Sequence, residues 1–330
     1  MTNSSIDVTP LVGFIGQYEK QIYEEALVGA EFYNMVTVDT TVKSNKKYTK
    51  RVVTSNARPF DAVFDSTGNK IKYTERGIAV ETLRDDYTLI PEEFRKTWLG
   101  QDADITNNEN PDYQGQLEGI TNKLIHDLNQ NIIWSADTAR PGTDAARYRQ
   151  IDGYHKQLKT AITNAGTTGI VVVATGALTG GTGNAYQGTA GNALVKLQLM
   201  DKAGVLYAAG VPRMAYMSYT TYYKIIADMK VAIVGEATEK SLMKDGPLGM
   251  GIYPEESEGL LKLCPCRFMG TTGRIFITTK DNIIFGTDTD LPTFGMFDLV
   301  KITHGYQLSA KMVYGVTFRD FENIVANELT

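Results

Sequence analysis

The sequence is poor in cysteine and histidine, the residues that most often mark disulfide-bonded or metal-binding proteins. It holds two cysteines and three histidines among 330 residues. Cys264 and Cys266 lie two positions apart, so a disulfide between them would be strained, and a disulfide-stapled extracellular scaffold is not expected. At most they form half of a zinc site, which needs four ligands at recognised spacings; two small buried thiols fit the pattern better. We therefore expect a reducing compartment and no metal or other cofactor.

Long apolar runs and an excess of positive charge are also missing. Nowhere do 18 apolar residues run together, and the N-terminal residues lack a basic start followed by an apolar segment, so neither a membrane span nor a signal peptide is predicted. The 33 basic and 38 acidic side chains give a net charge of -5, which argues against a broad cationic face that grips nucleic acid. With 42% apolar and 22% charged residues, the chain has the composition of a soluble globular protein.

A glycine-rich stretch is the strongest hint of ligand chemistry. Residues 170–191 read IVVVATGALTGGTGNAYQGTAG, a buried strand and a glycine-rich loop, and an apolar, helix-compatible run follows at 192–209. A phosphate-binding P-loop needs lysine and then serine or threonine where this chain has Thr189 and Ala190, and a dinucleotide fingerprint needs glycine or alanine in place of Tyr186. We therefore interpret the stretch as a surface loop, with an α/β nucleotide-using enzyme kept as an alternative. The loop residues of interest are Gly180, Gly181, Gly183 and Tyr186.

Other catalytic patterns are missing as well. His126, His155 and His304 stand far apart, and none of them sits in a recognised motif, although a triad can join residues distant in the chain. No G-x-S-x-G nucleophile elbow occurs, and adjacent acidic pairs such as Glu255-Glu256 point apart on any regular element. The sequence therefore predicts no active site and no enzyme.

Hydrophobic periodicity divides the first part of the chain into two segments. Residues 1–35 show the spacing of an amphipathic helix. Residues 36–82 alternate as β-strands do, with polar turns expected at 44–47 and 65–70. This stretch is polar at alternate positions and poor in leucine, which favours an extended β-arm over a compact domain.

The strongest helix is expected at 111–136. Asn110 and Pro111 supply an N-cap and a first-turn proline, and an apolar stripe then follows one face for about 26 residues, roughly 39 Å. Beyond this helix, strands and helices alternate from 151 to 290, and β-patterns return near the C-terminus. The expected strands are 170–175, 214–217, 276–279, 283–285, 296–302, 307–314 and 316–318, and the expected helices are 192–209 and one opened by Ser218 or Thr220.

Charge is distributed unevenly along the β-arm. Five cations fall within nine residues, and an acidic stretch lies just beyond the arm. The cations are Lys43, Lys46, Lys47, Lys50 and Arg51, and the acids are Glu81, Asp85, Asp86, Glu92 and Glu93. Two interpretations stay open: an exposed, solvated hairpin, or an arm lying across an acidic surface of a neighbouring copy, where complementary charge fixes register more than it adds affinity.

The order of these segments resembles that of the major capsid proteins of tailed bacteriophages. The resemblance spans nearly the whole chain by order and pattern, and it implies an α+β fold with an N-terminal arm, an extended β-hairpin loop, a peripheral domain with a long spine helix, and an axial domain. The residues that carry it are GQLEGITNKLIHDLNQNIIWSAD, QIDGYHKQL, GVPRMAYMSYTTYYKII and FDLVKITHGYQLSAKMVYGVTFRDF. The implied ranges are 1–35 for the arm, 36–82 for the loop, 83–150 and 291–330 for the peripheral domain with spine helix 111–136, and 151–290 for the axial domain.

The resemblance also implies a function. Copies of the chain would assemble into pentamers and hexamers and then into an icosahedral shell around double-stranded DNA, which is packaged without sequence specificity. Portal and scaffolding proteins would be further partners, no membrane would be involved, and the chain would be found in the virion capsid and, during assembly, in the host cytoplasm. The glycine-rich loop would be a mobile contact of the axial domain. An encapsulin-like nanocompartment, which shares the fold but encloses a cargo enzyme, is the first alternative.

Overall fold

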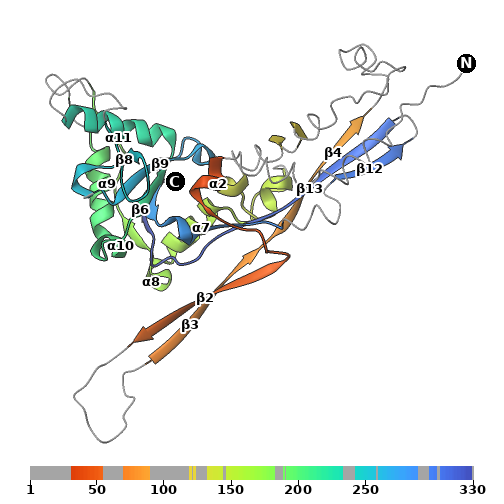
Figure 1. Cartoon of the computed structure of the whole chain (residues 1–330), viewed down its shortest axis with the longest axis horizontal. Coiled ribbons are helices and arrows are strands. Elements are labelled where there is room, and N and C mark those ends of the chain that lie inside the picture. The colour runs from red at the N-terminus through yellow and green to blue at the C-terminus, as the bar shows by residue number, and fades with distance from the viewer. Residues whose placement is uncertain are drawn as a thin grey trace, which may run out of the picture.

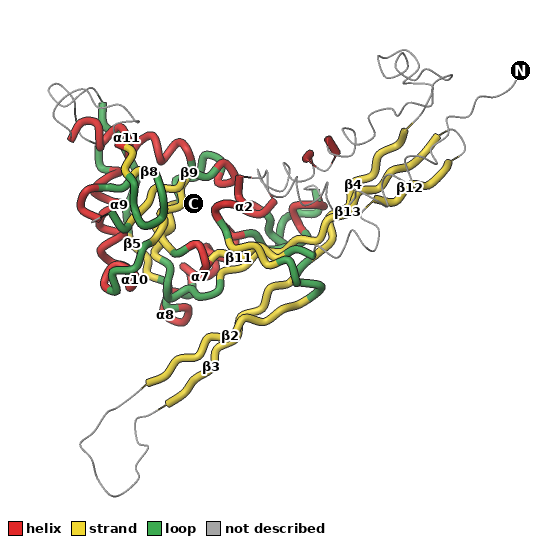
Figure 2. The backbone as a smooth tube through the Cα atoms, in the orientation of Figure 1, coloured by secondary structure: helices red, strands yellow, loops and turns green. Residues whose placement is uncertain are grey.

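The computed structural model shows a body of mixed helices and sheets from which two β-ribbons project in different directions (Figure 1). One ribbon is the hairpin β2–β3, and the other is formed by β4, β13 and β12 (Figure 2). The structure describes residues 31–54, 70–89, 119–120, 122–123, 132–143, 146–182, 189, 191–232, 242–257, 259–288, 297–302 and 305–328.

The described helices are short, and most of them lie in the body. They are α2 (Glu31–Met35), α6 (Ile133–Ser135), α7 (Tyr154–Thr163), α8 (Ala165–Thr168), α9 (Ala193–Ala203), α10 (Val205–Ala208) and α11 (Tyr219–Ala232). Single 3-10 turns occur at Ala146–Arg149, Glu255–Ser257, Arg267–Met269 and Lys280–Asn282. The strands are β1 (Thr37–Asp39), β2 (Asn45–Thr54), β3 (Lys70–Ala79), β4 (Glu81–Leu89), β5 (Val171–Val173), β6 (Arg213–Met217), β7 (Met243–Lys244), β8 (Gly251–Ile252), β9 (Leu261–Pro265), β10 (Ile275–Thr278), β11 (Ile283–Gly286), β12 (Phe297–Ile302), β13 (Gly305–Phe318) and β14 (Val325–Asn327).

A five-stranded sheet of order β5-β14-β10-β6-β9 forms the centre of the body. Strands β10 and β14 are buried on both faces, to which their successive side chains point in turn. Ile275 and Ile277 of β10 pack with the apolar sides of α9 and α11, whereas Phe276 between them packs with α6 and α7. Helices on both faces of the sheet therefore give the body its three layers.

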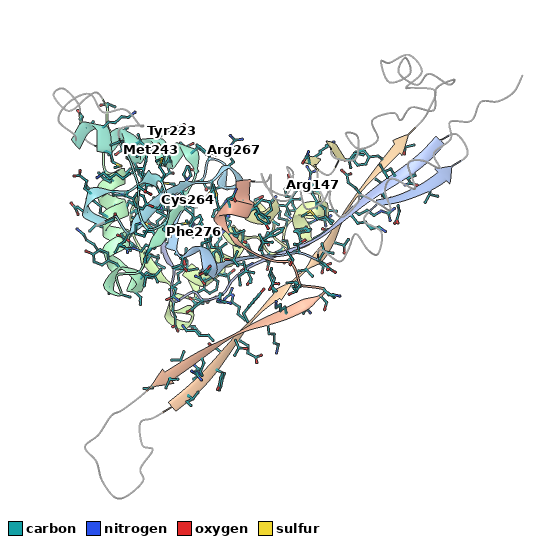
Figure 3. The ribbon with its side chains drawn as sticks, viewed as in Figure 1. Arg147, Tyr223, Met243, Cys264, Arg267 and Phe276 are labelled. Carbon is teal, nitrogen blue, oxygen red and sulfur yellow. The ribbon has the colours of Figure 1, made fainter. Side chains whose placement is uncertain are left out.

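A column of aromatic rings joins the sheet to the helices on its second face. The rings of Tyr216 and Phe276 are stacked with centroids 4.9 Å apart, and those of Phe276 and Trp134 are stacked at 6.1 Å. His155 of α7 stacks on the other side of Trp134 at 5.3 Å. Phe276 lies inside the body in Figure 3. The column packs α6 and α7 firmly against the sheet.

A single long strand, β13, connects the body to the second ribbon. Its residues 305–310 pair with β12 on one side and its residues 306–314 with β4 on the other, and its last four residues pair with β11 of the body. Sequence patterns predict two strands here, 307–314 and 316–318, but Gly315 continues the strand between them. A side chain at Gly315 would collide with the carbonyl oxygen of Ala79, so the glycine lets β3 and β4 meet close against β13.

The hairpin differs from its sequence-based prediction in one respect. Residues 44–47 are expected to form a turn, yet Asn45, Lys46 and Lys47 belong to β2, which pairs antiparallel with β3 over its whole length. The reason is that the Lys46 side chain binds Asp39 of the body, so a polar run is held in extended form. The segment that joins β2 to β3 lies outside the described residues, as does most of the second expected turn. Strand β1 pairs with β11 in the body instead of with β2.

Most other expected elements of the body are confirmed. Helix α11 begins after Ser218, whose hydroxyl oxygen accepts a hydrogen bond from the Thr221 backbone N–H at 3.3 Å. The expected helix 192–209 is divided at Gly204, whose backbone is extended and where Val325 leaves no room for a side chain. Most of the helix expected at 111–136 and nearly all of the leader at 1–35 lie outside the described residues.

A buried ion pair links α9 to the sheet. Arg213, the first residue of β6, donates hydrogen bonds through Nε and Nη2 to both carboxylate oxygens of Asp201 on α9, and both side chains are buried. Such a pair depends on both partners, because a single charge left in the core has neither water nor a counter-ion.

Replacing Asp201 with asparagine would keep the side-chain shape but leave the Arg213 charge unpaired. We expect the free energy of unfolding to fall by about 3–5 kcal/mol. Urea denaturation followed by circular dichroism measures the loss. Lys202→Gln on the same helix is the control, because Lys202 pairs with the exposed Glu256 and should contribute little. Equal stabilities of the two variants would contradict this prediction.

Candidate functional site

The hairpin β2–β3 presents two different faces, which its register defines. Lys46, Tyr48 and Lys50 lie on the same face as their cross-strand partners Ile78, Arg76 and Thr74. This inner face lies against the body at its base, where the side chains of β2 alternate between half-buried and exposed. The outer face carries Lys47, Thr49, Arg51 and Val53 opposite Gly77, Glu75, Tyr73 and Ile71.

At its base the inner face is attached to the edge strand β1 through Asp39. The Tyr48 hydroxyl donates a hydrogen bond to Asp39 Oδ2 at 2.7 Å, and Lys46 Nζ donates to the same oxygen at 2.5 Å. Thr41 donates to Oδ1 through its backbone N–H and its hydroxyl. Burial alone would raise the pKa of Asp39, but these hydrogen bonds outweigh it and hold the pKa well below its usual value.

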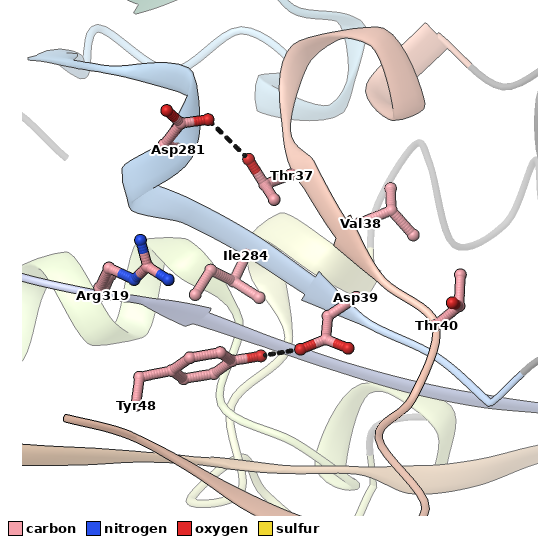
Figure 4. Close-up of a pocket in the computed structure, with 8 residues that line it drawn as sticks. All are labelled: Thr37, Val38, Asp39, Thr40, Tyr48, Asp281, Ile284 and Arg319. Atoms are coloured by element: carbon pink, nitrogen blue, oxygen red, sulfur yellow. Dashed lines mark hydrogen bonds between the residues drawn. The ribbon is translucent and has the colours of Figure 1, made fainter.

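A pocket of about 270 Å³ lies where the hairpin joins the body (Figure 4). Asp281, which accepts a hydrogen bond from the Thr37 hydroxyl at 3.4 Å, lines it together with the Tyr48 ring and Arg319. In the part of the chain that the structure describes, no group of three or more histidine, cysteine or acidic side chains could hold a metal ion. The pocket therefore offers charges of both signs and no evident metal site.

The predicted cation cluster is divided between the two faces of the hairpin. Lys46 and Lys50 lie on the inner face and bind carboxylates of the body, and Lys47 on the outer face binds Glu75 across the hairpin at 2.8 Å. Arg51 is exposed on the outer face, and Lys43 is exposed just before β2. The sequence therefore shows the cations together, whereas the structure divides them, and Lys46, Lys47 and Lys50 form ion pairs within their own chain.

Three of the predicted acidic residues lie on the other ribbon. Glu81, Asp85 and Asp86 belong to β4, where Asp86 accepts hydrogen bonds from Arg84 and Ser309, and Asp85 from the Tyr87 hydroxyl. Glu92 and Glu93 lie outside the described residues. In Figure 1, β4 runs away from the outer end of β2–β3. Asp85 and Asp86 therefore have hydrogen-bond partners on their own ribbon.

An exposed apolar group near the far end of the hairpin was not expected from the sequence. Val53, Ile71 and Tyr73 are 55%, 63% and 62% exposed, and all three lie on the outer face. The sequence does contain a signal for these side chains, because Ile71 and Tyr73 alternate with lysine and threonine. Alternation normally indicates a strand with one face on a core, so the sequence of an extended arm does not reveal which of its apolar side chains stay exposed.

The glycine-rich loop leads to a helix start that is already occupied by a carboxylate. The backbone N–H groups of Gly191 and Leu194 donate hydrogen bonds to the two oxygens of Asp228 on α11, at 2.9 and 3.0 Å. A phosphate would need these amides and would be repelled by the Asp228 charge. The loop closes through reciprocal hydrogen bonds between Thr182 and Thr189.

Part of this loop is closely packed on the body. Side chains added at Gly180 or Gly181 would meet Lys224 at 2.9 Å or Val231 at 3.0 Å, so these glycines lie tightly against α11. Gly183 and Tyr186 lie outside the described residues.

Both cysteines are buried and neither forms a disulfide, as their spacing suggests. None of the described helices is long and apolar enough to cross a bilayer.

Comparison with known proteins identifies the fold. No protein-family model matches the sequence, and no curated protein does. Among solved structures, a chain of the satellite phage P4 procapsid, a structure including the size determination protein Sid, superposes with a TM-score of 0.54 at 9% identity, covering 94% of this chain and 90% of that one. The capsid of the native GTA particle gives 0.52 at 12% identity, with coverages of 90% and 89%. The capsid of cyanophage P-SCSP1u gives 0.51 at 13%, with 91% and 88%.

These similarities extend over nearly the full length of each chain, at identities that carry information on the fold alone. The chain has the fold of the tailed-phage major capsid proteins, so the predicted resemblance and the mixed α+β class are confirmed.

The Asp39 attachment gives a prediction on pH. Because the pKa of Asp39 is lowered on folding, the unfolded chain binds its proton more readily, and the stability it contributes at neutral pH is lost as pH falls below about 4. In Asp39→Asn we expect lower stability at pH 7 and a smaller further loss between about pH 4 and pH 2. Thermal unfolding measured across this range tests it. Parallel curves for wild type and variant would show that Asp39 makes no such contribution.

Proposed function

We propose that this protein is a capsid shell protein: a major capsid protein whose copies form pentamers and hexamers of an icosahedral shell around double-stranded DNA. The observation that carries the proposal is the exposed apolar group on a projecting hairpin, in a chain with a capsid fold. The role is structural and not enzymatic. Portal and scaffolding proteins would be further partners, and the chain would reside in the virion capsid after assembly in the host cytoplasm.

The physical argument begins with the hairpin, which has no core of its own. Isolated two-stranded hairpins are at best marginally stable in water, and the outer face has no further layer of the same chain above it in the described structure. Val53, Ile71 and Tyr73 are stabilised only when another surface covers them, by about 1.5–3 kcal/mol for each large side chain fully buried. A closed shell repeats such a contact at every subunit, so the shell can be stable although each single contact is weak.

A second copy of the chain supplies the covering surface in this proposal. The outer face adds the exposed Arg51, and β4 carries the exposed carboxylates of Glu81 and Asp86, so opposite charges are available on separate ribbons. Lys46, Lys47 and Lys50 contribute less to this contact than the sequence suggests, because each binds a carboxylate of its own subunit. Charge would set the register of the contact more than its strength. Glu92 and Glu93 belong to the proposed acidic surface on sequence grounds alone.

The remaining segments receive roles from the same proposal. Residues 151–290 would form the axial domain around the five-fold and six-fold axes, 83–150 with 291–330 the peripheral domain, and 36–82 the loop that overlies a neighbour. A net charge of -5 limits adhesion of the shell to packaged DNA, which suits binding without sequence specificity.

The apolar contact can be removed without disturbing strand propensity. Val53, Ile71 and Tyr73 replaced together by threonine keep β-branched residues in both strands but lose most of the apolar area. We expect the subunit to fold as before and the association constant to fall by about 100-fold or more, since some 3 kcal/mol of burial is lost per contact. Negative-stain microscopy and light scattering of the expressed protein measure assembly. Val205→Thr, which removes an equally exposed valine from α10, is the matched control.

Three outcomes separate the alternatives. A wild-type protein that stays a 36.4 kDa monomer under all ionic conditions would rule out a shell. Unchanged assembly of the triple variant would rule out the hairpin contact. If shells form, nuclease-protected DNA indicates a virion capsid, whereas a co-purified enzyme inside the shell indicates a nanocompartment.

A further inference from the structure

A short loop of the body holds the hairpin by consecutive side chains. Residues 319–323 connect β13 to β14 and lie beside the inner face of the hairpin. The contacts are Arg319 over the Tyr48 ring at 5.8 Å, Asp320 and Glu322 on Lys50, and Phe321 under the Arg76 guanidinium. Each residue from 319 to 322 therefore meets a hairpin side chain.

Lys50 is the centre of this contact. Its Nζ lies 2.5 Å from Asp320 Oδ2 and 2.6 Å from Glu322 Oε2, so one cation bridges two carboxylates of the same loop. Burial by itself would lower the pKa of Lys50, but the hydrogen bonds to both carboxylates outweigh it and raise the pKa above its usual value. The Asp320 side chain is only 13% exposed, which reduces screening of this pair by water and salt.

Arg76 adds a second contact on the opposite strand of the hairpin. Its guanidinium lies 3.7 Å from the centre of the Phe321 ring, and its Nε is 3.4 Å from the Thr317 hydroxyl. Burial lowers the pKa of Arg76 to about 10, partly offset by the nearby Asp320 charge, and the group keeps its positive charge at neutral pH. Both strands of the hairpin are thus attached to the same loop.

The loop itself is fixed to the central sheet. Asn282 accepts a hydrogen bond from the Asp320 backbone N–H at 2.7 Å, and its Nδ2 donates to the Asp320 carbonyl and to Thr278 Oγ1, both at 2.8 Å. Thr278 of β10 in turn donates to the Asn323 carbonyl at 2.9 Å. Phe321 is buried against Phe318. A loop tied at so many points cannot turn with the hairpin, so it serves as a fixed reference for the hairpin's direction.

Attachment of the hairpin ends at Lys50. From Arg51 to Thr54 of β2, and from Ile71 to Glu75 of β3, every residue is exposed. The hairpin is therefore held near its base, and a small rotation there becomes a large displacement of Val53 and Ile71.

We propose that Lys50, bound between Asp320 and Glu322, is a positioning residue: these three side chains form a latch that sets the direction of the hairpin in the free subunit. The proposal rests on the proposed function in one point, that the direction of the hairpin decides where its apolar end meets a neighbouring copy. It assigns Lys50 an intramolecular role, whereas its place in the cation cluster suggested an intersubunit one.

Distances within the unassembled subunit test the latch. Spin labels on Thr54→Cys, at the end of β2, and Ala208→Cys, on the exposed side of α10, report the hairpin direction by double electron–electron resonance. Both native cysteines are buried, so labelling is selective, and labelled wild type without the new cysteines is the blank. The full chain is measured under conditions where light scattering shows monomers. We expect one narrow distance distribution for the doubly labelled protein that keeps Lys50.

Charge reversal at Lys50 should open the latch. Lys50→Glu places a third carboxylate beside Asp320 and Glu322, and we expect the distribution to broaden and shift, whereas Lys50→Arg should keep it narrow. Lys47→Glu is the matched control, because the same reversal three residues earlier faces away from the body. Should Lys50→Glu fail to fold, as judged by circular dichroism, Lys50→Met provides the neutral version of the test.

The latch would be overturned if Lys50→Glu, or Lys50→Met in its place, gave a distribution with the same width and centre as the labelled protein that keeps Lys50. So would equal broadening in Lys47→Glu, since the effect would then not depend on the 319–323 loop. The measurement needs no assembled shell, so a protein that never assembles can still show the latch. Conversely, shells built from a subunit with an unlatched hairpin would leave the proposed function standing.

Discussion

Strand β13 is the constraint on which the rest of the architecture depends. It pairs with β4 and β12 in the ribbon and with β11 in the body, so one continuous run of backbone hydrogen bonds fixes the ribbon to the core. The crossing of β3 into β4 is possible only because Gly315 has no side chain opposite Ala79. The chain then leaves β13 into the 319–323 loop, which holds the hairpin. One strand therefore determines the positions of both projections.

The two faces of the hairpin differ in what they contact. On the inner face Lys46 and Lys50 bind carboxylates of the body and Ile78 is buried against it, so the hairpin leaves the body in a defined direction. On the outer face Val53, Ile71 and Tyr73 are exposed, available for contact with another molecule. A projecting arm needs both properties: attachment strong enough to give it direction, and a free end that gains from contact.

The start of α9, after the glycine-rich loop, shows how the fold occupies a place that could otherwise bind a phosphate. A strand, a glycine-rich loop and a helix are present, but the amides that would hold a phosphate donate to Asp228 instead. The carboxylate stabilises the start of α9 and closes an anion site at the same time. The glycines of the loop serve close packing, since Gly180 and Gly181 lie against α11.

The sequence by itself determined the local structure: period-2 alternation indicated most strands, Ser218 marked the start of α11, and segment order indicated a capsid fold. It could not determine which face of the β-arm meets the body, because alternation is the same on a strand that lies on a core and on one that leaves it. Nor could it pair Lys50 with Asp320, 270 residues away, or bring Asp228 to the start of α9. Such pairings depend on how the strands stack in space, so they were decided only by the tertiary structure.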